Sequence, residues 1–279
     1  MTAPPPPPRV TGFLARDVPK GVLLRRGPSQ RAQLLAWNTD TDEIKAGQWL
    51  HGRVHESYSH LSPDGQHFIY KAYRYSRWNR EHDCEVWTGM SRPPYFSALA
   101  LWCHDCLQAG GGFFADEADV VLYGFDGRLA HADDRIAGGC PYTFSPNRSD
   151  GRPWRSRMVA DGWVPLVAEE QAEAERRSEA GRSCGRGLSI VEKRRDGVVL
   201  RAHDAVGNGA PTYTLEPCHV ELGGAEWADF DRRGRLVFTR DGCLWASSFA
   251  DGTWTTKMLA DFSANTFQPV PPTREALRW

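Results

Sequence analysis

The chain has 279 residues, of which 41% are hydrophobic and 25% charged, so it can form a buried core and has the composition of an ordinary globular protein. Its 34 basic and 35 acidic side chains leave a formal net charge of -1, which excludes a bulk electrostatic attraction to nucleic acid or to anionic membranes. No run of apolar residues approaches the roughly 20 that a membrane-spanning helix needs.

The cysteines and the N-terminal residues bear on the cellular compartment. Seven cysteines at wide, irregular spacing lack the density of a secreted disulfide scaffold, and the N-terminus lacks the basic start and apolar core of a secretory signal. We therefore expect free thiols and a cytoplasmic protein. Arginine outnumbers lysine by 29 to 5, a bias that is typical of GC-rich genomes and indicates a bacterial source.

The chain begins with a proline-rich segment, residues 1–12, in which five consecutive prolines favour an extended conformation and predict a flexible tail. Short β-branched, aromatic and aliphatic runs separated by turn residues occupy residues 13–270 and predict a single all-β domain. Asp-Gly, which suits the type I′ turn of a two-residue β-hairpin, occurs seven times, for example at Asp196-Gly197 and Asp241-Gly242. A second proline-containing segment, residues 271–279, predicts a C-terminal tail.

One stretch departs from the strand pattern. Residues 167–180, with the sequence VAEEQAEAERRSEA, combine strong helix formers with Glu-to-Arg spacings that stabilise a helix. The stretch has no apolar face for a core. It predicts an exposed helical insertion over residues 167–187.

The turns and short apolar strands form a sequence repeat. Each copy is a polar turn followed by a short apolar strand, and the copies are residues 61–73, 114–125, 191–203 and 228–246, with an earlier unit at 21–37. Repeats of about this size that hold several short strands are typical of propeller blades. The sequence therefore predicts a β-propeller of about five, within a range of four to six, four-stranded blades with one short helical insertion.

The best-defined copy also resembles a known family. HLSPDGQHFIYKAY, residues 60–73, resembles the motif of the TolB-type, WD40-like β-propeller repeat: Ser62, Pro63, Asp64 and Gly65 match its turn, and Gln66 stands where Lys or Arg is usual. Residues 226–247 resemble a degenerate copy. The resemblance implies a propeller fold and leaves the function open, because this repeat occurs in scaffolds and in accessory domains of peptidases. The residue types of the turn favour a structural role for all four matching residues.

An aromatic and basic segment, residues 73–87, is the strongest candidate for a binding surface. Residue types enriched at protein-binding hot spots occur within eight positions: Tyr73, Tyr75, Arg77, Trp78 and Arg80. The alternatives are stacking on single-stranded nucleic acid and a long hairpin loop that packs on the next blade. Strand alternation predicts that the two tyrosines are partly buried, and the position of Trp78 beyond the strand predicts that it is an exposed anchor.

Two metal hypotheses arise from the sequence. The CHDC cluster supplies Cys103 and Cys106, and Cys218 with His219 would complete a tetrahedral zinc set; the alternatives are a redox pair and free thiols. His51, His55 and His60 approach a metal-ligand spacing, but spacings of four and five residues suit no single strand face. We therefore expect no cofactor, with zinc as the alternative.

Acidic residues suggest a further possible function, glycoside hydrolysis. Asp229 with Asp231, and Asp116 with Glu117 and Asp119, fit ordinary turn and strand-edge roles, but carboxylates at the starts of inner strands also serve glycoside hydrolysis. The sequence favours a non-catalytic interaction module or scaffold of a bacterial cytoplasmic complex, whose partner is another protein and not a membrane. The alternatives are a polysaccharide hydrolase or lyase with its site in the central channel, and a nucleic-acid-associated adaptor.

Overall fold

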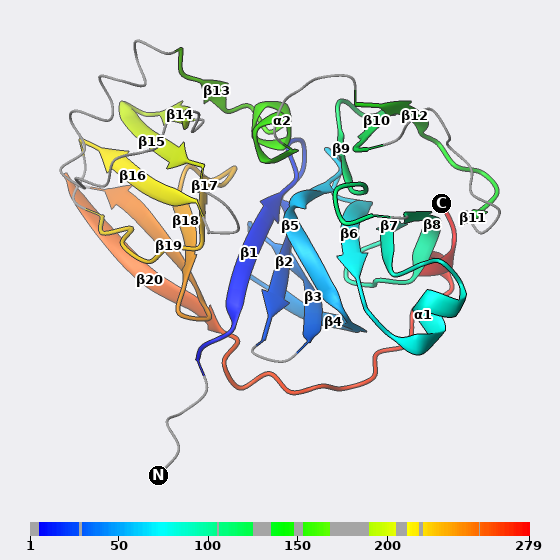
Figure 1. The fold of residues 1–279 in the computed structure, drawn as a ribbon. Coiled ribbons are helices and arrows are strands. Elements are labelled where there is room, and N and C mark those ends of the chain that lie inside the picture. The colour runs from blue at the N-terminus through cyan, green and yellow to red at the C-terminus, as the bar shows by residue number, and fades with distance from the viewer. Residues whose placement is uncertain are drawn as a thin grey trace.

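The structure is a computed structural model that describes residues 6–27, 30–104, 106–124, 135–147, 153–167, 190–204, 211–217, 220–250 and 252–279. Five β-sheets are arranged in a ring (Figure 1). Pairing within the described sheets is antiparallel except between β10 and β12. The predicted all-β propeller with about five blades is confirmed.

The first sheet contains β1 (Arg9–Leu14), β2 (Lys20–Arg26), β3 (Arg31–Asn38) and β4 (Ile44–His51). The second contains β5 (Arg53–Leu61), β6 (Phe68–Tyr73), β7 (Val86–Ser91), β8 (Ala98–His104) and β11 (Arg135–Ile136). The third contains β9 (Gly112–Phe114), β10 (Asp119–Leu122) and β12 (Thr143–Pro146).

The fourth sheet contains β13 (Val164–Pro165), β14 (Ile190–Arg195), β15 (Val198–His203) and β16 (Thr212–Glu216). The fifth contains β17 (Trp227–Phe230), β18 (Leu236–Arg240), β19 (Cys243–Ala250) and β20 (Thr253–Asp261). The described helices are α1 (Arg77–Glu81), α2 (Pro153–Ala160) and the 3₁₀ turn η1 (Glu275–Leu277).

Of the four Asp-Gly pairs that the structure describes, two adopt the conformation expected of them, whereas Asp64 and Asp161 have no positive φ. Asp196-Gly197 joins β14 to β15 with φ values of 48° and 79°, and Asp241-Gly242 joins β18 to β19 with φ values of 52° and 77°, as a type I′ turn requires. Two units are nevertheless out of register. The turns of the 21–37 and 191–203 units join the second and third strands of their sheets, whereas those of the 61–73, 114–125 and 228–246 copies join the first and second. The same turn chemistry serves both hairpins of a blade, so the motif alone does not fix the register.

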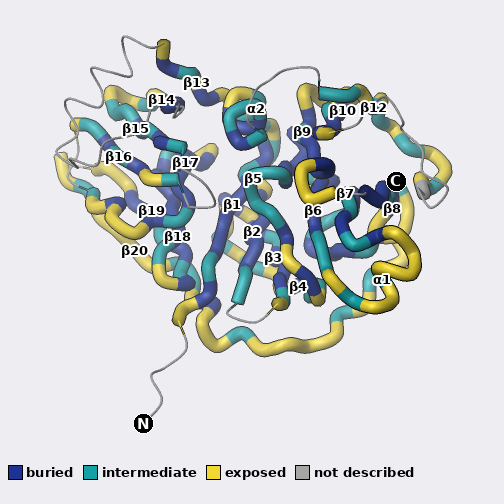
Figure 2. The backbone as a smooth tube through the Cα atoms, in the orientation of Figure 1, coloured by how far each residue is buried: buried dark blue, intermediate teal, exposed yellow. Residues whose placement is uncertain are grey.

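The core lies between neighbouring sheets, as the buried inner strands show (Figure 2). Phe13 of the first sheet meets Phe68 of the second edge to face, with ring centroids 5.1 Å apart. Trp37 and Trp227 belong to a cluster between the first and fifth sheets. The abundance of aromatic side chains therefore serves the packing between blades.

Helix α2 was not predicted by the sequence. It lies between the third and fourth sheets and buries Trp154, Arg157 and Met158 (Figure 1). The helix has only eight residues, and one of its three buried side chains is an arginine. Its sequence therefore shows no clear helical periodicity of apolar residues. The predicted insertion at 167–187 lies outside the described residues, apart from Val167.

Both ends of the described chain are anchored. Strand β1 begins at Arg9, inside the predicted tail of residues 1–12, and the Val10 amide donates to Glu226 of the fifth-sheet side at 2.6 Å. After β20, the chain runs past the first sheet to the second (Figure 1). There Trp279 packs beside Tyr142 and its Nε1 donates to the Ala137 carbonyl at 2.6 Å. The predicted C-terminal tail of residues 271–279 is thus a strap that connects sheets of the ring.

Candidate functional site

The SPDG turn uses its polar atoms on its own backbone. Ser62 Oγ accepts from the amides of Gln66 at 3.1 Å and His67 at 2.9 Å, and donates to Asp64 Oδ1 at 2.5 Å. The Gly65 amide donates to the Ser62 carbonyl at 2.9 Å, and Gly65 has a φ of 66°. These contacts support a structural role for the turn.

The aromatic and basic segment forms a hairpin tip between β6 and β7, in which residues 77–81 are helix α1. None of the residues of α1 is buried, and Trp78 is 62% exposed. Tyr73 is half-buried and stacks on His55, with ring centroids 5.1 Å apart. Tyr75 is 55% exposed, so the prediction that it is partly core is wrong. Strand β6 ends at Tyr73, and strand alternation therefore does not extend to residue 75.

The two arginines of this hairpin tip make exposed ion pairs. Arg77 Nε lies 2.7 Å from Glu81 Oε1, and Arg80 Nε lies 3.3 Å from Glu85 Oε1. Pairs of this exposure contribute little to stability. Tyr75, Arg77, Trp78 and Arg80 therefore lie together on the hairpin tip, whereas Tyr73 belongs to β6. Sequence reasoning missed the helix that presents the tip and the exposure of Tyr75.

The cysteines were expected to be free thiols, but two of them form a disulfide. Cys84, at the base of the hairpin tip, forms a disulfide with Cys103 in β8. Cys103 is therefore not available to bind zinc, and Cys106 is an exposed free thiol. Cys218 and His219 lie outside the described residues, and no group of three or more metal-binding side chains occurs in the part of the chain that is described. Disulfides persist mainly in oxidising compartments, so the argument from free thiols for a cytoplasmic protein no longer holds.

The three histidines do not converge. His51 and His55 lie on β4 and β5 and are not buried, whereas His60 is buried and faces Asp161. His60 Nδ1 accepts from the Phe114 amide at 3.0 Å, so the ring proton is on Nε2, which donates to Asp161 Oδ1 at 2.7 Å. The histidine thereby connects the second and third sheets with the turn after α2.

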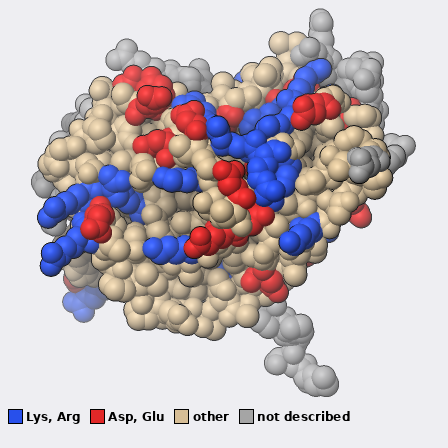
Figure 3. Space-filling model, turned by 180° about the vertical axis from the view of Figure 1, so that it is seen from behind, with Lys and Arg blue, Asp and Glu red and all other residues tan. Residues whose placement is uncertain are grey.

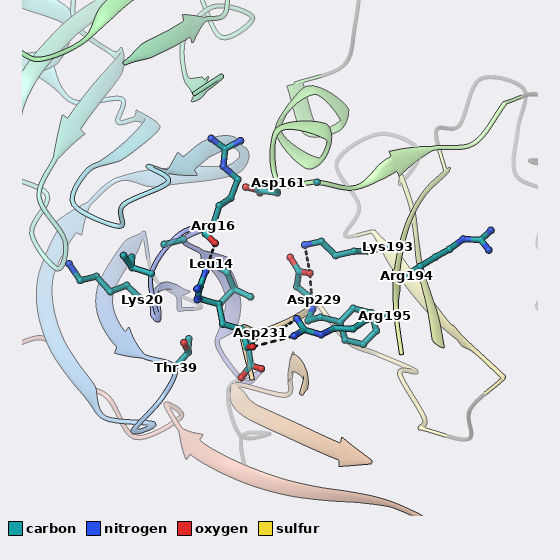
Figure 4. Close-up of a pocket in the computed structure, with 15 residues that line it drawn as sticks. Leu14, Arg16, Lys20, Thr39, Asp161, Lys193, Arg194, Arg195, Asp229 and Asp231 are labelled. Carbon is teal, nitrogen blue, oxygen red and sulfur yellow. Dashed lines mark hydrogen bonds and ion pairs between the residues drawn. The ribbon is translucent and has the colours of Figure 1, made fainter. Parts of the chain in front are cut away.

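A cavity of about 560 Å³, which we call the channel-mouth cavity, opens between the sheets of the ring where β1, β14 and β17 end (Figure 4). Its charged lining residues come from the first sheet, the turn after α2, the fourth sheet and the fifth sheet, and they are Arg16, Lys20, Asp161, Lys193, Arg194, Arg195, Asp229, Asp231 and Arg232. Sequence reasoning singled out Asp229 and Asp231 but not the cavity, because its members are far apart in the chain.

The pKa values of two carboxyl groups in this cavity are shifted in opposite directions. Burial raises the pKa of Asp229 although Lys193 Nζ lies 2.7 Å from its Oδ1. Burial also favours the neutral form of Asp161, but the bond from His60 and the nearby charges of Arg157 and Lys193 lower the net pKa of this group. Opposite shifts of two carboxyls in one site are a feature of acid–base pairs.

Two other acidic residues of the sequence analysis, Asp116 and Asp231, have turn roles. Asp116 Oδ1 accepts from the amides of Ala118 and Asp119, each at 2.8 Å. Asp231 accepts from the Arg235 amide at 2.9 Å and from its Nε at 2.8 Å. On the face opposite to that of Figure 1, basic and acidic side chains intermix in a central band, in keeping with the near-zero net charge (Figure 3).

The fold and its channel-mouth cavity define the class of the protein as a five-bladed β-propeller. No family model matches the chain, and no curated protein matches it significantly. Among the described residues, no helix is both long enough and apolar enough to cross a membrane.

Proposed function

We propose that this propeller is a non-catalytic interaction module that contacts another protein through the hairpin tip, residues 75–82. The observation that carries the proposal is that α1 buries none of its residues although it holds Trp78. A helix this short is not stable by itself, and a tryptophan on it gains little from the fold. Exposed tryptophan flanked by arginine is the typical composition of a binding hot spot.

The hairpin tip is ordered before any partner binds. Ser76 caps α1 by accepting from the Asn79 amide at 3.1 Å, and Asn79 Nδ2 donates to the Cys84 carbonyl at 2.9 Å. The Cys84–Cys103 disulfide fixes the return of the chain to the sheet. A preformed tip loses less conformational entropy on binding than a mobile loop does.

The side chains of the tip indicate the chemistry of the partner. Trp78 stacks on His82, with ring centroids 4.2 Å apart, and so presents a broad apolar surface. Arg77 and Arg80 flank it, each in an exposed ion pair with a glutamate. We infer a partner with an apolar pocket whose rim carries charged side chains of both signs.

We expect Trp78→Ala to weaken partner binding by about 2 kcal/mol, or about 30-fold, because a hot-spot aromatic contact is lost. The melting temperature should stay nearly unchanged, since the side chain is exposed. The measurement is quantitative affinity capture from the native host with the wild-type and variant proteins, followed by binding titration with the captured protein. Phe249→Ala is the matched control, because Phe249 is 60% exposed on the fifth sheet. A captured protein that binds the wild type and Trp78→Ala equally well would refute the proposal.

A polysaccharide hydrolase or lyase at the channel mouth is the second candidate function, favoured by the opposite pKa shifts of Asp161 and Asp229. On this reading Asp229 donates a proton to the leaving group and Asp161 accepts one. Asp229→Asn should then reduce cleavage of polygalacturonate or alginate roughly 100-fold, whereas Asp116→Asn should not. New reducing ends report either reaction, and unsaturated products report the lyase reaction alone. Absence of both with the wild-type protein would reject this candidate.

A further inference from the structure

Basic side chains gather at one corner of the molecule, where the first sheet passes into the second. Strand β4 ends at His51 and β5 begins at Arg53, with Gly52 between them. Arg31, at the start of β3, is the strand partner of His51. A Cβ atom at Gly52 would lie 3.5 Å from the Cβ atom of Arg74, which follows β6. We call this set the basic corner: Arg31, His51, Arg53 and Arg74.

The arginines of the basic corner have no acidic neighbours of their own. Arg77 and Arg194, elsewhere on the surface, lie 2.7 Å and 2.6 Å from glutamate oxygens. In the part of the chain that the structure describes, no carboxylate oxygen lies within 4.0 Å of a side-chain nitrogen of Arg31, Arg53 or Arg74. The positive charge of the corner is therefore not neutralised by the described residues.

The charges at the corner act on one another. Partial burial and, after it, the positive charges of Arg74 and Arg31 lower the pKa of His51 below its ordinary value of 6.5. Among the described residues, no carboxylate shifts this pKa in the opposite direction. His51 is therefore neutral at pH 7, and the arginines alone carry the charge of the corner.

An aromatic ring supports one of these arginines. The guanidinium carbon of Arg31 lies 4.4 Å from the ring centroid of Phe267, in the segment that runs past the first sheet after β20 (Figure 1). Phe267 in turn meets Trp49 of β4 edge to face, with centroids 6.2 Å apart. A guanidinium group that stacks on a ring still has its N–H donors in its own plane. Arg31 is thus held in place without loss of its charge.

The basic corner adjoins the hairpin tip. Arg74 directly precedes Tyr75, the first residue of the tip, and the Arg74 amide donates to the Glu85 carbonyl at 2.9 Å. The rings of Tyr73 and Tyr75 lie 5.7 Å apart and join the two regions. A protein that covers Trp78 would therefore have the corner beside its contact region.

We propose that the basic corner binds an acidic segment of the protein that contacts the hairpin tip. The inference rests on the proposed function for the identity of that partner. The three arginines leave the backbone on or beside different strands, so each can pair with a separate carboxylate of an extended segment, and a guanidinium group can do so through two parallel hydrogen bonds. Single-stranded nucleic acid fits the corner less well, because it needs free aromatic faces for its bases and Phe267 already has Arg31 over its ring.

The test is fluorescence anisotropy of labelled hexaglutamate with the full chain at low salt, where exposed charges are least screened. We expect hexaglutamate to bind and hexaglutamine not to bind. Arg31→Gln and Arg74→Gln should each weaken hexaglutamate binding about threefold, and the double variant about tenfold, since each change removes one exposed charge pair. Arg74 makes no side-chain hydrogen bond to a described residue, so its variant keeps the test valid if Arg31→Gln disturbs the segment that holds Phe267.

The matched control is Arg233→Gln, which removes the same charge beyond the opposite end of β3, where Arg233 donates to the Asp40 carbonyl at 3.2 Å. It should leave hexaglutamate binding unchanged. The proposal is overturned if hexaglutamate does not bind at millimolar concentration, if Arg233→Gln weakens it as much as Arg74→Gln does, or if hexathymidylate binds more tightly than hexaglutamate.

Failure of the hairpin tip as a binding site gives a different result. Trp78→Ala then leaves binding of the captured protein unchanged, whereas Arg74→Gln still weakens hexaglutamate binding. If the tip binds the captured protein, the double variant of Arg31 and Arg74 should weaken that complex about tenfold as well. An unchanged affinity of the captured protein for the double variant would overturn the proposal while leaving the role of the tip intact.

Discussion

Arg235→Ala should lower the free energy of unfolding by about 3–5 kcal/mol, because it removes one side of a buried ion cluster. The Arg235 side chain is 9% exposed and joins the fifth sheet to the first. Its Nη1 and Nη2 each lie 2.8 Å from an oxygen of Asp42, its Nε lies 2.8 Å from Asp231 Oδ2, and its Nη2 donates to the Thr39 carbonyl at 2.9 Å. Without the guanidinium, Asp231 becomes a buried carboxylate without a cation. Urea unfolding of both proteins at neutral pH measures the difference.

The same cluster predicts a dependence on pH. The hydrogen bond from Arg235 holds the pKa of Asp42 below its ordinary value of 3.8. A carboxyl with a depressed pKa stabilises the fold above its unfolded pKa, and this contribution is lost as the pH falls through the folded value. We therefore expect the wild type to lose part of its stability below about pH 4. Arg235→Ala should lose less over the same range.

A neighbouring arginine provides the control for this prediction. Arg233 also approaches Asp42, but at 3.7 Å and with 46% of its side chain exposed. Arg233→Ala should cost less than about 1 kcal/mol. Equal losses for the two variants would contradict a special role of the buried cluster.

Gly47→Ala should destabilise the protein by about 3 kcal/mol or more, because there is no room for a side chain between the first and second sheets. A Cβ atom at Gly47 would lie 2.0 Å from the Pro94 carbonyl oxygen and 2.7 Å from the Leu34 carbonyl oxygen. Both neighbours are backbone atoms, so rotation of a side chain cannot relieve the contact. The adjacent Gln48 amide donates to the same Pro94 carbonyl at 2.9 Å, and separation of the two sheets would break that bond.

Thermal unfolding and soluble yield measure this effect. Gly138→Ala is the matched control, since a Cβ atom there would meet no heavy atom within 4 Å. A melting temperature of Gly47→Ala equal to that of Gly138→Ala would show that the two sheets can separate slightly at no cost. The result would then argue against tight contact between these blades.

The sequence by itself determined the fold class and the local turns, because both depend on residues close together in the chain. Alternating apolar runs and Asp-Gly pairs specify strands and hairpins locally, and Asp241-Gly242 adopts the predicted conformation. The exposure of Trp78 was also predictable, since it lies beyond the end of a strand. The position of Tyr75 was not, because the end of β6 depends on its pairing with β7.

Only the tertiary structure decided the channel-mouth cavity, the Cys84–Cys103 disulfide and the burial of Arg235. Asp161 and His60 are 101 residues apart in the chain, and Arg235 and Asp42 are 193 apart. Closure of the ring brings the ends of β1, β14 and β17 to one mouth, and each strand contributes only one or a few charged residues there. No local pattern encodes such a meeting, since each of these residues fits an ordinary turn when it is considered with its sequence neighbours alone. The physical reason is that blade packing, and not local propensity, sets which turns face one another across the channel.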